Sequence, residues 1–279
     1  MRTKKTLSLL KNKELTNATL KKNDIPTSDG ENRSFFSALA FVQQVSFPLV
    51  IKPTYGTLSQ GAHFPINSWP HFVYAFFASK RYGWHTMVEK YYSGKSYRIV
   101  VTQDNMLAAA HRLPANVIGN GKDTIKQLIQ QKNKDPRRKP KEIQNTTLHH
   151  VIIDNNTTRM LRQQNKTLHS IPAQDEQIFL EQKLLLSRGG DVIDITDQVH
   201  PKNKAMFIRT ATVLGANLAG IDCIMTDISQ PWNEQETGII DVNGKPYIDM
   251  HHFPSQGITR NIAKSIVSLL DDIPSGIYL

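Results

Sequence analysis

The sequence predicts an α+β fold, with antiparallel sheet and packed helices in a chain of 279 residues. Three features lead to this prediction. Apolar residues recur at helical spacing in several stretches, short runs of β-branched residues alternate with polar residues, and three such runs follow one another closely enough to pair as a meander. A chain of this length buries a full core, as one large domain or as two intimate lobes.

The helices are predicted from the spacing of their apolar residues and from the residues that begin or end them. Leucines recur at helical spacing in the first of them, and Pro26 follows soon after its end. Asp123 is placed to cap the fourth helix, and Ile262 and Ile266 lie on the apolar face of the last. The predicted helices are residues 4–23, 34–44, 69–82, 124–132, 201–217 and 258–270.

The strands are predicted where β-branched residues alternate with polar ones. Three of them, at 88–92, 97–101 and 106–111, are expected to form an antiparallel meander, with the turn at Ser93 and Gly94 as a hinge between lobes. Residues 135–176 are polar and irregular, with a short strand expected at 151–154. The other predicted strands are residues 49–52, 192–196, 220–225 and 239–243.

Two strands near the C-terminus carry oxygen-bearing side chains. Asp241 and Asn243 lie two residues apart in one strand, so their side chains point to the same face. A carboxylate from a neighbouring strand, Asp222, completes a set of oxygen donors of the kind that a hard cation such as Mg²⁺ prefers. Asp and Asn at strand ends are also ordinary turn residues, so spacing alone leaves both interpretations open.

A second signal lies upstream, where the apolar strand at 49–52 ends on Lys52. A loop with Gly56, Ser59 and Gly61 follows, so one ammonium group and several backbone amides can converge on phosphate oxygens. This is not the Gly-x4-Gly-Lys-Ser/Thr phosphate loop, because the lysine precedes the glycines. A surface β-turn explains the same residues, but nucleotide and metal are used together, which favours reading the two signals jointly.

The composition limits the binding partners and the cellular location that we expect for this protein. The formal net charge of +10 attracts anions, and candidates are nucleic acid, an acidic lipid surface, ATP or an acidic peptide. The basic run at 132–141 is expected to be a solvated loop, and it lacks the interleaved aromatic residues of a nucleic-acid platform. No apolar run approaches the roughly 20 residues that span a bilayer, and the N-terminus lacks a signal peptide. We therefore expect a cytoplasmic protein without membrane or nucleic-acid partners.

The single cysteine, Cys223, sits in an apolar run, where it excludes an internal disulfide and is expected to pack in the core.

Taken in order, the segments from residue 25 to residue 274 resemble the ATP-grasp ligases. The resemblance is strongest to the ATP-grasp portion of cyanophycin synthetase and of the bifunctional glutamate-cysteine ligase/glutathione synthetase. Together the matching segments are specific, although none suffices alone. They are EKYYSG at 89–94 with Tyr97 and Arg98, RLPANVIGNG at 112–121, NKDPR at 133–137, GGDVIDITD at 189–197, and DVN at 241–243 with Met250 and His251.

The resemblance implies two lobes of antiparallel sheet with packed helices that clasp ATP. The first would be residues 1–90, holding the N-terminal helices and the small lobe, and the second residues 91–279, holding the large lobe and the metal site. Lys52 would contact the phosphates, the loop through Gly56, Ser59 and Gly61 would fold over them, and Asp222, Asp241 and Asn243 would hold Mg²⁺, with Mn²⁺ as an alternative. The hinge backbone would hold adenine at Glu89, Lys90, Tyr91 and Tyr92.

The chemistry implied by the resemblance is ligation of a carboxylate to an amine. ATP phosphorylates the carboxylate, and the amine displaces phosphate from the acylphosphate to form an amide. Arg98, Arg112 and Arg188 are the cations expected near the transferring phosphoryl group, where charge builds in the transition state. Each of them can equally form a surface or structural salt bridge.

The sequence departs from the family pattern at several positions. Ser96 stands where an acidic residue usually holds the ribose. Asp241, whose side chain is one methylene shorter, replaces the usual metal-binding Glu. Ahead of the Gly189-Gly190 turn, Glu181 and Leu185 replace an Arg and an Asn. Residues 244–247 replace the common Pro-Gly after Asn243, which affects the acceptor pocket. The preceding α/β domain of the family is expected to be absent, with Lys4 as the nearest candidate for its lysine.

Two functions follow from these observations. The first is an ATP- and Mg²⁺-dependent ligase that forms a peptide-like bond on a small amino acid or an acidic peptide. The second is a degenerate ATP-grasp protein that binds nucleotide without turnover and serves as a regulatory or scaffold partner. A separate protein would supply the missing N-terminal domain, and the sequence leaves a homo-oligomer open. It does not reveal which carboxylate and which amine are joined.

Overall fold

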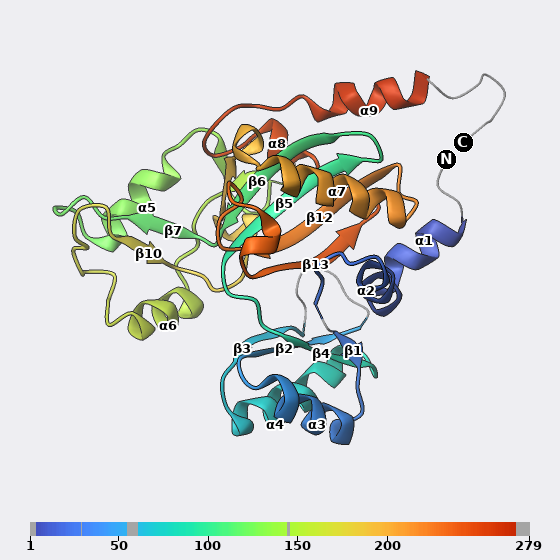
Figure 1. Cartoon of the computed structure of the whole chain (residues 1–279). Helices are drawn as coiled ribbons and strands as arrows, with labels where there is room; N and C mark the ends of the chain where they lie inside the picture. The colour runs from blue at the N-terminus through green and yellow to red at the C-terminus, as the bar shows by residue number, and fades with distance from the viewer. Residues whose placement is uncertain (1–3, 29, 55–60, 144–145, 272–279) are drawn as a thin grey trace. The chain divides into compact units, whose positions relative to one another are not determined.

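The computed structural model describes residues 4–28, 30–54, 61–143 and 146–271. Contacts divide the chain into two units, Met1–Ala109 with Thr196–Pro246 and Ala110–Ile195 with Tyr247–Leu279. Figure 1 labels most of the helices and strands of both units. The mixture of helices and antiparallel sheets confirms the predicted α+β class.

The first unit contains a small four-stranded antiparallel sheet in the order β1-β4-β2-β3. Its strands are β1 (Glu31–Asn32), β2 (Leu49–Pro53), β3 (His63–Ile66) and β4 (Thr86–Lys90). Two helices, α3 (Phe35–Val45) and α4 (Trp69–Ser79), cover one face of this sheet (Figure 1), and the 3-10 turn η1 (Lys80–Tyr82) follows α4. Ser34 begins α3 by accepting a hydrogen bond from the backbone N–H of Ser37.

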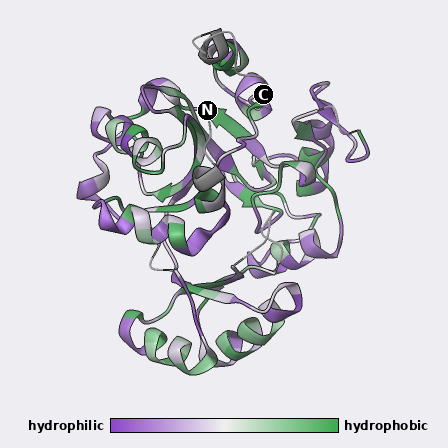
Figure 2. Ribbon diagram, turned by 90° about the vertical axis from the view of Figure 1, so that its right-hand side faces the viewer, coloured by the Kyte–Doolittle hydropathy of each residue, from purple (hydrophilic) through white to green (hydrophobic). Residues whose placement is uncertain are grey.

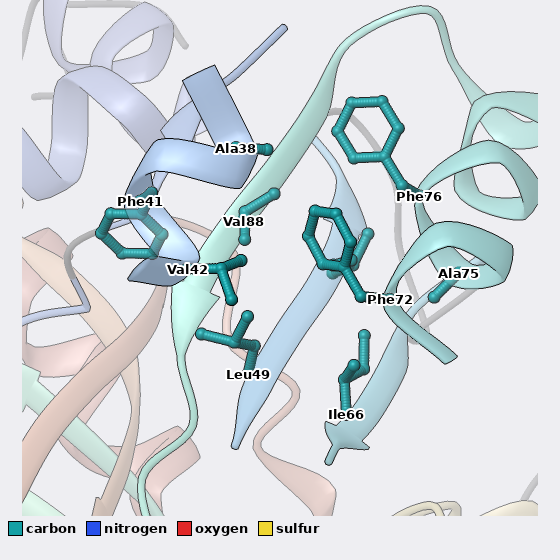
Figure 3. Packing of buried hydrophobic residues seen from close by; sticks show 10 residues of the cluster. Ala38, Phe41, Val42, Leu49, Ile66, Phe72, Ala75, Phe76 and Val88 are labelled. Atoms are coloured by element: carbon teal, nitrogen blue, oxygen red, sulfur yellow. The ribbon is translucent and has the colours of Figure 1, made fainter. Parts of the chain in front are cut away.

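A compact apolar core lies between this sheet and its helices (Figure 3). Leu49 and Ile51 of β2 point into it and are 0% exposed. Because side chains alternate along a strand, Val50 and Lys52 point to the opposite face, which the helices do not cover. In β4, Val88 likewise belongs to the core and Glu89 points the other way. The alternation therefore places Lys52 and Glu89 on one face.

The first unit also contains a larger antiparallel sheet, in which β5 and β13 flank β12. The strands are β5 (Lys95–Thr102), β12 (Leu218–Met225), β13 (Thr237–Asn243) and the beginning of β6 (Met106–Leu113), which follows β5. Helix α7 (Pro201–Val213) lies over β5 and β12 (Figure 1) and begins with Pro201 at its first position. The remaining elements are α1 (Lys4–Lys11), α2 (Lys13–Lys22), η3 (Thr196–Gln198) and η4 (Trp232–Glu234).

The second unit begins within β6, whose end pairs with β11 (Asp191–Asp194). Two short pairs of strands accompany it: β7 (Asn116–Ile118) with β10 (Gln177–Phe179), and β8 (Arg138–Lys139) with β9 (Leu148–His149). Helices α5 (Ile125–Asn133) and α6 (Asn155–Gln163) pack against a core that includes Ile125 and Leu161. The other elements are η2 (Leu186–Arg188), α8 (Asp249–His252) and α9 (Ile262–Asp271).

Several local predictions need correction. The meander is wrong in its first strand, because β4 pairs with β1 and β2 of the small sheet, whereas β5 and β6 are neighbours in the large sheet. Thr124, not Asp123, caps α5, through a capping box with Gln127. The strand expected at 151–154 is absent, because Asp154 instead caps α6. Asn12 divides the first predicted helix into α1 and α2.

The predicted lobe boundary and the prediction of no membrane-spanning segment can also be compared with the structure. The lobe boundary predicted at residue 90 falls at the end of β4, inside the first unit, so the division into two lobes stays a prediction. Within the described part of the chain, no helix combines the length and the apolar character that crossing a membrane requires.

Candidate nucleotide and metal site

Lys52 and Glu89 form an ion pair on the helix-free face of the small sheet. The Lys52 Nζ lies 2.7 Å from the Glu89 Oε2, and the two side chains are 13% and 3% exposed. The neighbouring backbone at Gly30 closes over the carboxylate, since a Cβ at Gly30 would lie only 2.2 Å from the Glu89 Oε1. The predicted phosphate-binding lysine is therefore fixed in place by a buried carboxylate.

A chain of buried hydrogen bonds holds Glu89 from the other side. Ser28 Oγ donates to Glu89 Oε1 at 3.1 Å, and Asn17 Nδ2 donates to Ser28 Oγ at 3.0 Å. Thr27 Oγ1 then donates to the Asn17 Oδ1 at 3.0 Å, while the Ile239 N–H on β13 donates to the carbonyl of Pro26 at 2.9 Å. These contacts connect α2, the small sheet and β13. Sequence reasoning missed Ser28, which no motif identified.

The end of β4 and the segment after it, predicted as the hinge, contact the chain around the start of β13 and the chain before β1. Lys90 Nζ donates to Glu236 Oε1 at 2.8 Å, and this hydrogen bond lowers the pKa of Glu236. Tyr92 donates its hydroxyl hydrogen to the Thr27 carbonyl at 3.1 Å, and its ring lies against Gly238 so closely that a Cβ there would be 2.6 Å from a ring carbon. The Tyr91 N–H donates to the carbonyl of Pro48 at 3.1 Å. Glu236 contacts the predicted hinge, and the sequence did not indicate this contact.

The three predicted metal donors lie on β12 and β13. Asp222 and Asp241 are direct cross-strand partners, so their side chains share one face of the sheet. Asn243 lies two residues beyond Asp241 on that face, and its Nδ2 donates to the Asp241 Oδ2 at 3.1 Å. Two carboxylates and an amide thus converge, as the alternation of side chains predicts. Their oxygen atoms are the ligand type that Mg²⁺ takes, so the residues fit this ion.

Basic side chains already accompany both carboxylates. The Arg98 Nε lies 3.0 Å from the Asp222 Oδ1, and the Lys13 Nζ lies 3.7 Å from the Asp241 Oδ1. Arg98 is also the cross-strand partner of Asp222 on β5. Among the described residues no cluster of three or more His, Cys, Asp and Glu side chains is arranged to hold a metal, so a site here depends on Asn243. Lys13 was not predicted to lie at this site.

The other predicted nucleotide contacts are Gly56, Ser59, Gly61 and Ser96. Gly56 and Ser59 lie outside the described residues. Gly61 has a φ of +67°, a conformation that glycine adopts without strain. Ser96 is buried in β5, where its Cα pairs with Ile224, and its proposed contact with the ribose stays a prediction.

Arg112 and Arg188 belong to the second unit. Arg188 is held by two carboxylates, with its Nε 2.6 Å from Glu181 Oε2 and its Nη2 2.6 Å from Asp154 Oδ2. Glu181 therefore has a structural partner in Arg188. Arg112 lies in β6 opposite Val192. The placement of these two arginines near a phosphoryl group stays a prediction.

The basic run at 132–141 is exposed at most of its residues, as predicted, but Arg138 is an exception. Its first two residues end α5, and Arg138 is only 4% exposed because it pairs with the buried Asp191. Lys132 pairs with the same carboxylate, and Asn116 donates a hydrogen bond to it. Burial lowers the pKa of Lys132, although Asp191 opposes this effect. These residues line a cavity of about 580 Å³ in the second unit.

Cys223 confirms the prediction of a core cysteine, since it is 0% exposed in β12. Burial raises the pKa of its thiol, which keeps the thiol protonated and unreactive.

Comparison with known proteins identifies the family. Cyanophycin synthetase from Trichormus variabilis is 35% identical over 260 residues, which cover 92% of this chain and 29% of the relative. A bifunctional glutathione synthetase from Pasteurella multocida superposes with a TM-score of 0.72 at 29% identity, covering 96% of this chain and 36% of that one. The ATP-grasp ligase PsnB shares the fold, with a TM-score of 0.53 at 10% identity over 95% of this chain and 62% of that one.

The chain belongs to the ATP-grasp family. This confirms the resemblance that the motifs indicated. The ATP-grasp chain spans less than a third of the length of the cyanophycin synthetase that it matches. No family model matches it.

Proposed function

We propose that this ATP-grasp chain is an ATP- and Mg²⁺-dependent carboxylate-amine ligase, which activates a carboxylate as an acylphosphate and joins it to an amine. The observation that carries the proposal is the convergence of Asp222, Asp241 and Asn243 on one face of β12 and β13, in a chain that aligns with a cyanophycin synthetase over nearly its whole length. The substrate we propose is a small amino acid or an acidic peptide.

Each part of the site has a proposed role. Lys52 would neutralise charge on the phosphates of ATP, because its ammonium group is a compact positive charge that attracts anionic oxygens. Asp222, Asp241 and Asn243 would hold Mg²⁺, which neutralises charge on the phosphate oxygens when bound. The segment from Glu89 to Tyr92 would receive adenine along its backbone.

Arg98 has a different role in this proposal. It already pairs with Asp222 on the neighbouring strand, with a side chain that is 11% exposed. Its guanidinium group carries several N–H donors, so Arg98 can donate both to Asp222 and to a phosphoryl oxygen. We propose that it both orients Asp222 and stabilises the transferring phosphoryl group.

A degenerate nucleotide-binding protein is the second candidate. The observation that favours it is the pairing of both metal-binding carboxylates with cations of the protein, Asp222 with Arg98 and Asp241 with Lys13. These cations compete with Mg²⁺ for the same oxygens. Such a protein would bind ATP without turning it over.

A phosphate-release screen separates the two candidates. The chain is incubated with Mg-ATP and each amino acid or simple dipeptide, and phosphate, ADP and the ligated product are measured together. The ligase predicts stoichiometric ADP, phosphate and amide with at least one pair of substrates. Stabilisation by ATP without turnover across the whole panel would favour the degenerate protein.

A further inference from the structure

The second unit contains a polar cavity that the proposed nucleotide and metal site does not use. Helices α3 and α4 of the small sheet are largely green in Figure 2, whereas α5 of the second unit has the more polar sequence IKQLIQQKN. The cavity beside α5 has a volume of about 580 Å³, within the range of about 300–1,000 Å³ that is typical of small-molecule sites. Its walls come from β7, the end of α5, the segment after α5, the start of β11 and residues 255–256. All of these belong to the second unit, whereas the proposed metal donors belong to the first.

Positive charge exceeds negative charge in the walls of this cavity. Residues 132–141 contain six lysine and arginine residues but a single carboxylate, Asp135. Four of the six cations line the cavity, together with Asp135 and Asp191, so two positive charges are in excess. A concave site lined mainly by one sign of charge focuses the electrostatic field, and this cavity therefore attracts anions. The four cations are Lys132, Lys134, Arg137 and Arg138.

The buried carboxylate at the cavity does not neutralise its surroundings. Asp191 is 7% exposed and pairs with both Lys132 and Arg138, while the Asn116 Nδ2 donates to it at 2.9 Å. One carboxylate thus faces two cations. Burial lowers the pKa of Lys132, and the nearby Arg138 adds to this effect in smaller measure, because both disfavour a further positive charge here. A bound anion would offset that charge.

Two ammonium groups at the cavity have capacity for a ligand. The Lys132 Nζ donates to the Asn116 carbonyl at 2.7 Å and to Asp191. An ammonium group has three N–H donors, so one donor of Lys132 has no acceptor among the described residues. The Lys132 side chain lines the cavity and is 19% exposed, which leaves that donor accessible. Lys134, the exposed C-cap residue of α5, forms no ion pair within the described part of the chain.

The cavity also has an apolar wall, which narrows the kind of anion that fits. Val117 and Leu128 are 3% and 7% exposed, but Ile118 is 48% exposed, and all three line the cavity. An inorganic anion gains nothing from apolar surface, whereas the carbon chain of an organic anion is stabilised by covering it.

We propose that this cavity binds an organic carboxylate, such as an acidic amino acid or the acidic end of a peptide. Lys132 and Lys134 would meet the carboxylate, and Ile118 would contact the carbon chain. The proposal concerns the second unit alone, so it does not depend on whether the first unit turns over ATP.

The first test is calorimetric titration of the full chain with succinate and with N-acetylglutamate, in the absence of Mg-ATP. We expect binding that weakens as salt is added, because salt screens the attraction between charges. Lys132→Met should weaken it by at least about tenfold, and Arg138 still pairs with Asp191 in this variant. Lys134→Gln, at an exposed position, should weaken it without affecting folding. Lys126→Met, at an exposed lysine of α5 outside the cavity, is the matched control and should bind normally.

A second test needs no substitution. Acetic anhydride labels accessible lysines, and mass spectrometry of the peptides reports how fast each one reacts. Succinate should slow the labelling of Lys132 and Lys134 and leave that of Lys126 unchanged, while the neutral succinamide should protect none of them.

Several results would overturn the proposal. One is the absence of binding by either carboxylate at about 10 mM. Another is equal affinity in the wild type, Lys132→Met and Lys134→Gln, because the carboxylate would then be bound elsewhere. Inorganic phosphate that binds as tightly as succinate, with the same sensitivity to the two variants, would also overturn it, since the apolar wall would then have no role.

Discussion

At the scale of single residues, Lys52 and Glu89 depend on each other. Glu89 is only 2% exposed, and its charge is balanced by the Lys52 ammonium group and by the hydroxyl of Ser28. Removing one partner of a buried ion pair leaves the other charge uncompensated, which is strongly destabilising. A substitution at Lys52 therefore has two consequences, one for stability and one for nucleotide binding, and they have to be separated.

We predict that Lys52→Met lowers the free energy of unfolding by about 3 kcal/mol. The double variant Lys52→Met/Glu89→Gln should recover most of this loss, because a neutral amide tolerates burial better than an unpaired carboxylate. ATP binding should stay lost in both variants, as measured by calorimetry alongside urea denaturation. Normal ATP affinity in the double variant would show that Lys52 serves only to neutralise Glu89.

Asp241 is the donor at which metal binding is most easily tested. Its replacement by Asn keeps the size of the side chain and its contact with Asn243, but removes the charge that attracts a divalent cation. Asp241→Asn should weaken the Mg²⁺-dependent part of ATP binding by at least about tenfold. Titration of Mg²⁺ at fixed ATP measures this. Asp104→Asn, in an exposed turn of the same unit, is the control that should change nothing.

At the scale of elements, β13 supports the predicted hinge through Gly238. Gly238→Ala would place a Cβ 2.6 Å from the Tyr92 ring and so push the ring from its hydrogen bond with the Thr27 carbonyl. Overpacking of this kind costs about 1–3 kcal/mol. Chemical denaturation should detect the loss. Gly83→Ala, whose Cβ would have no neighbour nearer than 3.7 Å, should be neutral, and equal stability of the two variants would contradict the described packing.

Helix α6 should show a measurable dependence on pH. Partial burial raises the pKa of Asp154, but the hydrogen bonds from Arg188 and from the Thr157 and Asn156 N–H groups outweigh this effect, so the pKa lies below its ordinary value. A carboxyl with a depressed folded-state pKa stabilises the fold above its unfolded pKa, and this contribution disappears as the pH falls through the folded pKa.

The melting temperature of Asp154→Asn should therefore be below that of the wild type at pH 7, and the difference should shrink below about pH 4. Asn still caps a helix, so the difference isolates the pairing with Arg188. A difference that stays constant from pH 7 to pH 3 would argue against an ionised Asp154 in this pair.

Local patterns predicted most elements but not all of their partners. Apolar spacing located helices α2 to α5, α7 and α9, and alternation placed Asp241 and Asn243 on one face, which the structure bears out. The meander failed because β4 finds its partners in β1 and β2, and nothing in the local sequence states which sheet a strand joins. Helix α6 was missed because its sequence, NNTTRMLRQ, is polar, and it depends on the Asp154 cap and on Leu161 in the core.

At the scale of the whole molecule, the site is assembled from segments far apart in the chain. Lys13 and Asp241 are separated by most of the sequence, and the two carboxylates meet only because β12 and β13 pair in register. The residue types of Lys52, Asp222, Asp241 and Asn243 suit phosphate and metal, and these roles stay predictions from the sequence. The sequence could not indicate Ser28, Lys13 or Glu236, whose roles follow from tertiary contacts alone.

Local sequence patterns also could not predict how the chain divides into units. The chain leaves the first unit within β6 and returns to it at Thr196, so each unit is built from two separate stretches of sequence. The basic run at 132–141 illustrates the consequence. It has the composition of a solvated loop, but Asp191, more than fifty residues away, draws Arg138 into the interior of the second unit.

The central claim is that Lys52 and the donors on β12 and β13 together bind Mg-ATP, and thermal stabilisation tests it most directly. A ligand that binds only the folded state raises the unfolding free energy by about 2.7 kcal/mol at 100 times its Kd. We predict a clear rise in Tm with ATP and Mg²⁺, a smaller one with ATP alone, and none in Lys52→Met/Glu89→Gln. An unchanged Tm of the wild type at millimolar Mg-ATP, or an equal rise in the double variant, would contradict the claim.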